Sequence, residues 1–138
     1  MSATSAAAAR GRILVVEDDP EAALFAVFVL ANRAQFDVMH TADPAVALRL
    51  VTTEHWDLVL TDVQMPGMTG LELLGGLRRI APALPVAVVT AHAPAGPAEA
   101  ALLLGADAYL EKPLGINQLI STATALIGEG RAHRGDGR

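Results

Sequence analysis

Short apolar runs rich in β-branched residues alternate with helix-length segments along most of the chain. These runs occupy residues 13–16, 36–39, 58–60, 86–89 and 108–110. Each has the length and composition of one strand. Strands separated by helix-length connections pair in parallel, with right-handed crossovers that place helices on both faces of the sheet. The alternation therefore predicts an α/β fold with a doubly wound, five-stranded parallel sheet.

Capping residues indicate where the helices begin. Asp19-Pro20 and Asp43-Pro44 each offer a carboxylate at the N-cap and a proline at the first helical position. Residues 69–72, Thr-Gly-Leu-Glu, have the pattern of a capping box. Together with the apolar spacing, these signals predict five helices, at 20–33, 44–54, 70–80, 97–104 and 116–127.

The two ends of the chain lack the pattern of a folded element. Residues 1–11 begin with a Ser/Ala run, and residues 128–138 are rich in Gly and Arg. We therefore expect a disordered N-terminal tail over 1–11, one domain over 12–127, and a flexible tail or linker over 128–138.

Composition excludes several classes of protein. The chain has no cysteine, so a disulfide scaffold, a thiol nucleophile and a thiolate metal site are ruled out. Its longest apolar stretch, 22–31, is too short to span a bilayer, and the N-terminus lacks the pattern of a signal peptide. A net charge of −5 and scattered arginines disfavour direct binding of nucleic acid. We expect a cytoplasmic protein without a membrane partner.

Polar residues follow four of the five predicted strands. In an open parallel sheet, ligands bind beyond the carboxyl ends of the strands. The candidate residues at those positions are Glu17, Asp18, Asp19, Asp62, Thr90 and Lys112. The second strand is followed by His40 and Thr41, which offer no charge. Clustered carboxylates repel one another unless a hard cation such as Mg²⁺ neutralises them, so the pattern predicts Mg²⁺ and a phosphoryl group.

Lys112 stands out because it is the only lysine, whereas nine residues are arginine. A compact ammonium suits a point contact with a carboxylate or phosphoryl oxygen in a narrow crevice. Lys112 is therefore a candidate member of the same site.

Four sequence motifs include these residues. They are Ile-Leu-Val-Val-Glu-Asp-Asp at 13–19, Leu-Thr-Asp-Val-Gln-Met-Pro-Gly-Met-Thr-Gly at 60–70, Val-Val-Thr-Ala-His at 88–92, and Gly-Ala-Asp-Ala-Tyr-Leu-Glu-Lys-Pro at 105–113. Jointly they resemble the receiver domains of two-component response regulators, of the chemotaxis-receiver type. The resemblance implies a flavodoxin-like sheet with strand order 2-1-3-4-5 and five helices.

The resemblance also implies the parts of a phosphoryl-transfer site. Asp62 matches the phosphoacceptor, and the metal ligands would be Asp18, Asp62, the backbone carbonyl of Gln64, and Glu17 through a water molecule. The implied ion is Mg²⁺, or Mn²⁺. It implies no separate substrate, so the chain would not be an enzyme in the usual sense.

Further residues match the family's phosphoryl-binding and switching positions. Thr90 and Lys112 would contact the phosphoryl group, and Thr90 and Tyr109 would form the switch. The Lys112–Pro113 peptide bond is expected to be cis. The implied phosphodonor is a sensor histidine kinase or a phosphotransfer protein, or a small donor such as acetyl phosphate.

Three other functions fit parts of the pattern. A haloacid-dehalogenase-like phosphatase also has an aspartate nucleophile after a strand, but it requires an acid two residues later, where this chain has Gln64. A flavodoxin-like carrier requires a phosphate-binding loop after the first strand, where the acidic residues at 17–19 would repel FMN. A pseudo-receiver used only for protein contacts is disfavoured by the intact acidic set.

Two predicted helices have unusual surfaces. The helix at 20–33 is apolar almost all round, which indicates either a wide core-facing surface or a docking face for a kinase helix bundle or a second copy of the chain. The helix at 116–127 contains no charged residue, which leaves room for an apolar dimer contact. The output function stays open, because the chain fits a stand-alone receiver and a receiver cut from a longer regulator equally well.

Overall fold

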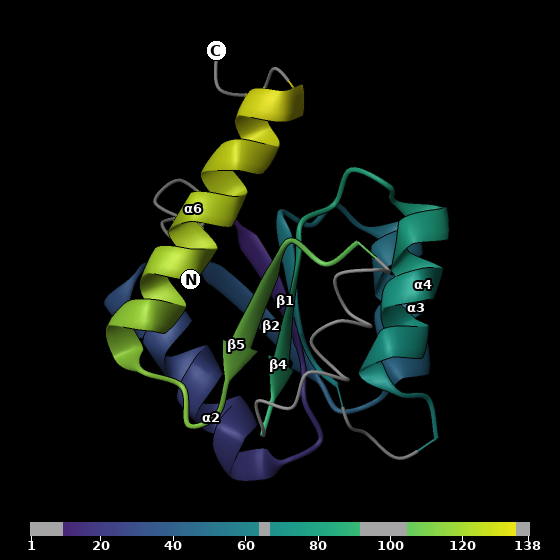
Figure 1. Cartoon of the computed structure of the whole chain (residues 1–138). Coiled ribbons are helices and arrows are strands. Elements are labelled where there is room, and N and C mark those ends of the chain that lie inside the picture. The colour runs from purple at the N-terminus through teal and green to yellow at the C-terminus, as the bar shows by residue number, and fades with distance from the viewer. Residues whose placement is uncertain (1–9, 64–66, 92–104, 135–138) are drawn as a thin grey trace.

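A single parallel sheet organises the chain in the computed structural model, which describes residues 10–63, 67–91 and 105–134 (Figure 1). Its strands are β1 (Arg12–Val16), β2 (Asp37–Thr41), β3 (Leu58–Asp62), β4 (Val86–Thr90) and β5 (Ala108–Glu111). They lie in the order β2-β1-β3-β4-β5, and every neighbouring pair is parallel. The predicted fold class and strand order are confirmed.

Helices cover both faces of this sheet. Among the described residues they are α2 (Pro20–Phe28), the π-helical turn η1 (Val29–Arg33), α3 (Pro44–Thr53), α4 (Gly70–Ile80) and α6 (Ile116–Arg134). Helices α2 and α6 lie on one face and α3 and α4 on the other (Figure 1). The predicted helix at 97–104 lies outside the described residues.

Alternate residues of the central strands pack into two separate cores, one on each face of the sheet. Ile13 and Val15 of β1 pack with α2 and α6, whereas Leu14 and Val16 pack with α3 and α4. Strands β3 and β4 are buried along their whole length, but β2, at the edge, is mostly exposed. The carboxyl ends of β3 and β4 are therefore held rigidly between two helical layers.

The predicted N-caps are present. The side chain of Asp19 accepts from the N–H of Glu21 at 3.3 Å, and that of Asp43 accepts from the N–H of Ala45 at 2.9 Å. Thr69 and Glu72 form both hydrogen bonds of the capping box, at 2.8 and 3.1 Å. These caps fix the starts of α2, α3 and α4 at the carboxyl edge of the sheet.

Helix α4 begins directly against the end of β3 because its first residue is glycine. The N–H of Gly70 donates to the carbonyl of Val63 at 2.8 Å. A Cβ atom on Gly70 would lie 1.9 Å from the carbonyl oxygen of Asp62, so no other residue fits without displacing the strand end.

The predicted limits of β2 and α6 were wrong. Strand β2 spans 37–41, not 36–39, so His40 and Thr41 belong to it and Phe36 precedes it. The pairing with β1 explains the difference, because residues 37–41 pair one by one with residues 12–16. The limits of an edge strand depend more on its neighbouring strand than on its own hydrophobicity.

Helix α6 was predicted to end at Ile127 but continues to Arg134, and its last turns project beyond the sheet (Figure 1). Neither Gly128 nor Gly130 has the positive φ that ends a helix, and each lowers helix stability by only about 1 kcal/mol relative to Ala. Residues 128–134 are therefore helical. No helix in the described ranges is both long enough and apolar enough to cross a membrane.

Candidate functional site

Parallel pairing brings the ends of four strands to one edge of the sheet. Val16 of β1 pairs with Thr61 of β3, so the next residues, Glu17 and Asp62, are neighbours across the two strands. Thr90 ends β4, which flanks β3 on its other side. The predicted site residues of these strands therefore lie together.

Three carboxylates form the centre of the site. Oxygen atoms of Glu17, Asp18 and Asp62 lie within 4.8 Å of one another. Glu17 and Asp62 are buried, whereas Asp18 is exposed. An all-oxygen set with one open side fits a hard divalent cation that keeps part of its hydration shell. Gln64, a further predicted ligand, lies outside the described residues.

Lys112 bridges the two buried carboxylates. Its Nζ lies 2.9 Å from Oε1 of Glu17 and 3.1 Å from Oδ2 of Asp62. Its backbone N–H donates to the carbonyl of Thr90 at 2.7 Å, and the Lys112–Pro113 bond is cis. The ammonium therefore supplies one positive charge to a group of three carboxylates.

Burial and mutual contacts shift the pKa values of Glu17 and Lys112. Burial, together with the hydrogen bond to Asp62, raises the pKa of Glu17 to about 7, although Lys112 acts in the opposite direction. Burial alone would lower the pKa of Lys112, but its contacts with Glu17 and Asp62 outweigh this and raise it. The lysine thus stays charged, and Glu17 takes up a proton more readily than an exposed glutamate does.

Thr90 and Tyr109 lie on a common face of the sheet. Their strand neighbours Val89 and Leu110 pack into the core beneath α2 and α6, so side-chain alternation places Thr90 and Tyr109 on the α3 and α4 side. Thr90 is buried and Tyr109 is partly exposed. Tyr109 pairs with Val88, two residues before Thr90.

One contact was missed by the sequence analysis. Nε2 of His40 lies 2.8 Å from the backbone carbonyl oxygen of Glu17. An uncharged strand end gives no sign of a role for His40 in the sequence, but in the structure its ring bonds the backbone of Glu17. A prediction that extended β2 to Thr41 would have placed His40 beside Glu17.

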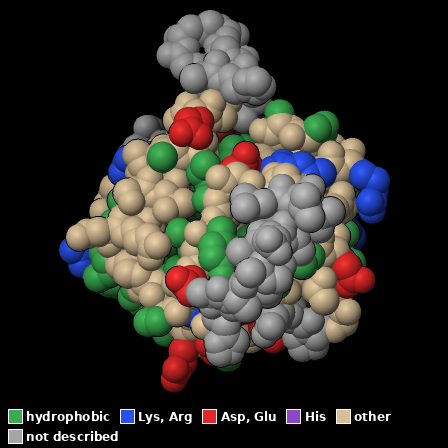
Figure 2. Space-filling model, viewed as in Figure 1, with side chains coloured by type: hydrophobic (Ala, Val, Ile, Leu, Met, Phe, Trp, Pro, Cys, Tyr) green, Lys and Arg blue, Asp and Glu red, His purple; other side chains and the backbone are tan. Residues whose placement is uncertain are grey.

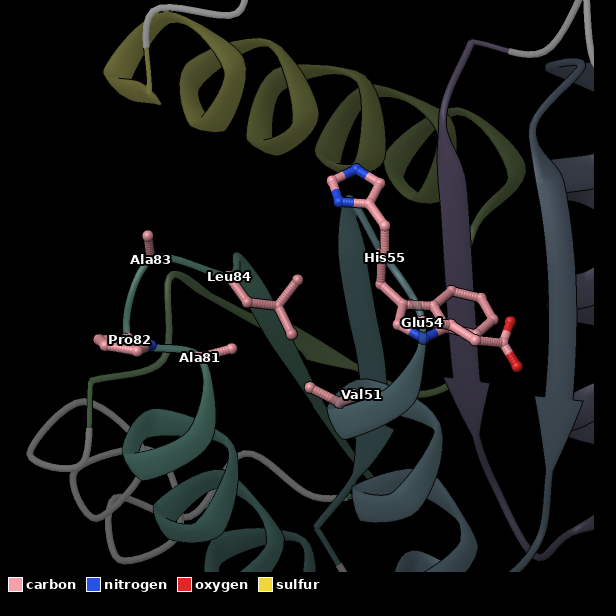
Figure 3. Close-up of a pocket in the computed structure, with 8 residues that line it drawn as sticks. Val51, Glu54, His55, Ala81, Pro82, Ala83 and Leu84 are labelled. Carbon is pink, nitrogen blue, oxygen red and sulfur yellow. The ribbon is translucent and has the colours of Figure 1, made fainter.

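A pocket of about 550 Å³ lies at the opposite end of the sheet (Figure 3). Val51, His55 and Leu84 line it between the C-terminal ends of α3 and α4. The carboxylates are separated from it by the length of a strand, roughly 16 Å for five residues. This pocket therefore plays no part in the acidic site.

The comparison with protein families decides the identity of the chain. A model of the response regulator receiver domain matches residues 13–124. The chain belongs to this family.

Regulators and sensor kinases both contain relatives of this receiver domain. The transcriptional activator protein IrlR of Burkholderia pseudomallei is 35% identical over 121 residues, which cover 88% of this chain and 52% of IrlR. The sensor histidine kinase GacS of Pseudomonas protegens is 35% identical over 132 residues, covering 92% of this chain and 14% of GacS. The chain thus spans only about half, or less, of these relatives.

Solved receiver structures share its fold. A CheY-like receiver domain protein from Methanospirillum hungatei is 28% identical, with a TM-score of 0.83 over 88% of this chain and 97% of its own. The receiver domain of sensor histidine kinase PA1611 from Pseudomonas aeruginosa is also 28% identical, with a TM-score of 0.79 over 86% and 98%. That structure has a magnesium ion coordinated in its active site cleft.

The raised pKa of Glu17 predicts a pH-dependent stability of the metal-free receiver domain. Between pH 4.5, the ordinary pKa of a glutamate, and about 7, folded Glu17 retains a proton that unfolded Glu17 has released. The free energy of unfolding contributed by Glu17 therefore falls as the pH rises through this window. Glu17→Gln is neutral at every pH, so urea denaturation with EDTA should show the wild type losing stability relative to this variant. Glu21→Gln, on the exposed start of α2, is the control, and a constant difference between wild type and Glu17→Gln would contradict the account.

Proposed function

We propose that this receiver domain accepts a phosphoryl group on Asp62 from a phosphohistidine of a sensor histidine kinase or phosphotransfer protein. The observation that supports this is a buried aspartate at a strand end, held by Lys112 within a carboxylate cluster. An Oδ atom of Asp62 attacks phosphorus, the phosphorus–nitrogen bond breaks, and an acyl phosphate forms while the histidine keeps the electron pair. Such a donor obtains its phosphoryl group from ATP, so the proposal includes a cytoplasmic location.

Glu17, Asp18 and Asp62 are proposed to hold Mg²⁺, or Mn²⁺, with the backbone carbonyl of Gln64 as a further ligand. When bound, such an ion would supply positive charge against the phosphoryl oxygens during transfer. Asp18 is exposed, so a hydrated ion could reach its carboxylate, whereas buried Glu17 is already bonded to Lys112. The cluster therefore combines an accessible ligand with fixed ones.

Lys112 and Thr90 are proposed to bind the phosphoryl group once it is on Asp62. Lys112 already contacts Oδ2 of Asp62, so its ammonium needs little movement to reach an attached phosphoryl oxygen. The hydroxyl of Thr90, at the end of the adjacent strand, would donate a second hydrogen bond.

Thr90 and Tyr109 are proposed to carry the signal away from the site. Their side chains share one face of neighbouring strands, so a movement of Thr90 changes the space that Tyr109 can occupy. The product of the reaction is then a reshaped protein surface and not a released compound. Because the chain spans about half the length of IrlR, this proposal covers the receiver step alone.

Direct nucleic-acid binding by this chain is not part of the proposal. On the described part of the face in Figure 2, Lys and Arg side chains form no continuous stripe. The net charge of the whole chain is −5.

Intact mass spectrometry after incubation with acetyl phosphate and Mg²⁺ tests the phosphoacceptor. We expect the wild type to gain one phosphoryl group and Asp62→Asn to gain none, because the amide cannot act as the nucleophile. Asp19→Asn is the matched control: it removes a neighbouring carboxylate outside the cluster but retains a good N-cap, so it should be phosphorylated normally. Equal labelling of wild type and Asp62→Asn would contradict the assignment.

An exposed apolar surface adjoins the site. On α2, Leu24 is 72% and Phe28 is 54% exposed. Next to them, Phe25 and Leu114 line a pocket of about 470 Å³ that reaches Lys112. An apolar patch of this kind indicates a protein contact, and its continuity with Lys112 suits a partner that delivers a phosphoryl group to Asp62. We propose that the helix bundle of the phosphodonor docks here, and not a second copy of the chain.

Leu24→Glu tests this docking face. A panel of autophosphorylated histidine-kinase cores is screened, and the core that transfers fastest is used for the comparison. We expect transfer to Leu24→Glu to be at least about tenfold slower, because a buried interface charge costs more than 1.4 kcal/mol, while labelling by acetyl phosphate is unchanged. Ile80→Glu is the control, since Ile80 is also exposed, at 43%, but lies at the end of α4.

Sedimentation of the same variants tests whether the α2 face binds the phosphodonor or a second copy of the chain. The docking proposal predicts a wild-type protein whose association state does not depend on Leu24. A wild-type dimer that Leu24→Glu dissociates, with kinase transfer unaffected, would assign the face to a second copy.

A further inference from the structure

Strand β2 holds both backbone polar groups of Glu17. The N–H of Glu17 donates to the carbonyl of Thr41 at 3.1 Å. Its carbonyl oxygen lies 2.8 Å from Nε2 of His40. Because a carbonyl can only accept, this nitrogen carries the proton, and His40 is the donor. Glu17 is thus clamped from the side opposite to Lys112.

The side chain of His40 replaces a backbone bond that the sheet cannot form. In a parallel ladder, the carbonyl of Glu17 would accept from the N–H of residue 43, two residues after Thr41. Here the chain turns away to cap α3, and the N–H of Asp43 donates to the side chain of Thr41 at 3.1 Å. The carbonyl of Glu17 therefore loses its ladder partner, and the imidazole of His40 takes that place.

This contact fixes the peptide plane between two members of the acidic cluster. The carbonyl of Glu17 belongs to the peptide that joins it to Asp18, so its orientation sets the direction in which the Asp18 backbone leaves β1. Asp18 is exposed, so its side chain is not fixed by burial. Glu17 has two other restraints on its carboxylate, from Lys112 and from the N–H of Asp19 at 3.1 Å. His40 therefore acts mainly on the placement of Asp18.

We propose that His40 is a positioning residue for the divalent-cation site, acting through the Glu17–Asp18 peptide. This proposal rests on the proposed binding of Mg²⁺ by Glu17, Asp18 and Asp62. A merely structural role for His40 would lower the stability of the β2 edge without changing how tightly the folded protein binds the ion.

Calorimetric titration with MgCl₂ distinguishes these roles. We expect His40→Leu to bind Mg²⁺ about 3- to 10-fold more weakly than the wild type, the size of effect that one lost hydrogen bond produces. His40→Gln offers an amide N–H of similar reach and should recover part of the affinity. His55→Leu is the matched control, because His55 is also exposed but lies at the opposite end of the sheet, where it contacts Asp57.

Two further readouts accompany the titration. Thermal unfolding in EDTA should show the unfolding temperature of His40→Leu lowered by no more than the few degrees that one lost hydrogen bond costs a domain of this size. In labelling by acetyl phosphate, His40→Leu should require more Mg²⁺ for half-maximal rate and reach the wild-type rate at saturation. Unchanged Mg²⁺ affinity in His40→Leu, with or without a lower unfolding temperature, would overturn the positioning role alone. If the wild type itself binds no Mg²⁺, the proposed metal site fails and the role of His40 fails with it.

Discussion

The ammonium group of Lys112 offsets the negative charge that is buried at the carboxyl edge of the sheet. Glu17 and Asp62 are buried next to each other, and two buried carboxylates without compensation would be strongly destabilising. Lys112 lies within hydrogen-bond distance of both. Even so, among the described residues the ammonium of Lys112 faces three carboxylates, and burial together with the hydrogen bond to Asp62 raises the pKa of Glu17 to about 7. A divalent cation on the side of Asp18 is what would balance the cluster.

The fold delivers these groups to one place through its strand order. Because β1, β3 and β4 lie side by side at the centre, Glu17, Asp62 and Thr90 emerge together. Burial on both faces leaves β3 little freedom, and Gly70 allows α4 to begin in contact with the end of that strand. The edge strand β2 adds the clamp on the backbone of Glu17. Stability and site geometry therefore depend on the same contacts.

Much of this arrangement could be predicted from the sequence. Apolar runs and capping residues located the strands and helix starts, and the rule that parallel strands end at one edge grouped the carboxylates with Lys112. The limits of β2 could not be predicted, since its register follows β1, and the role of His40 was missed with them. The end of α6 was also misplaced, because glycine in a sequence does not reveal whether its backbone adopts the conformation that ends a helix.

The most direct test of the central claim is a crystal structure of the wild-type protein with Mg²⁺ and beryllofluoride, a phosphoryl mimic. The account predicts beryllium bonded to an Oδ atom of Asp62, the ion held by Asp18 and Asp62, and Lys112 Nζ with Thr90 Oγ1 on the fluorine atoms. An unmodified Asp62 that still contacts Lys112, with the ion bound elsewhere or not at all, would contradict it.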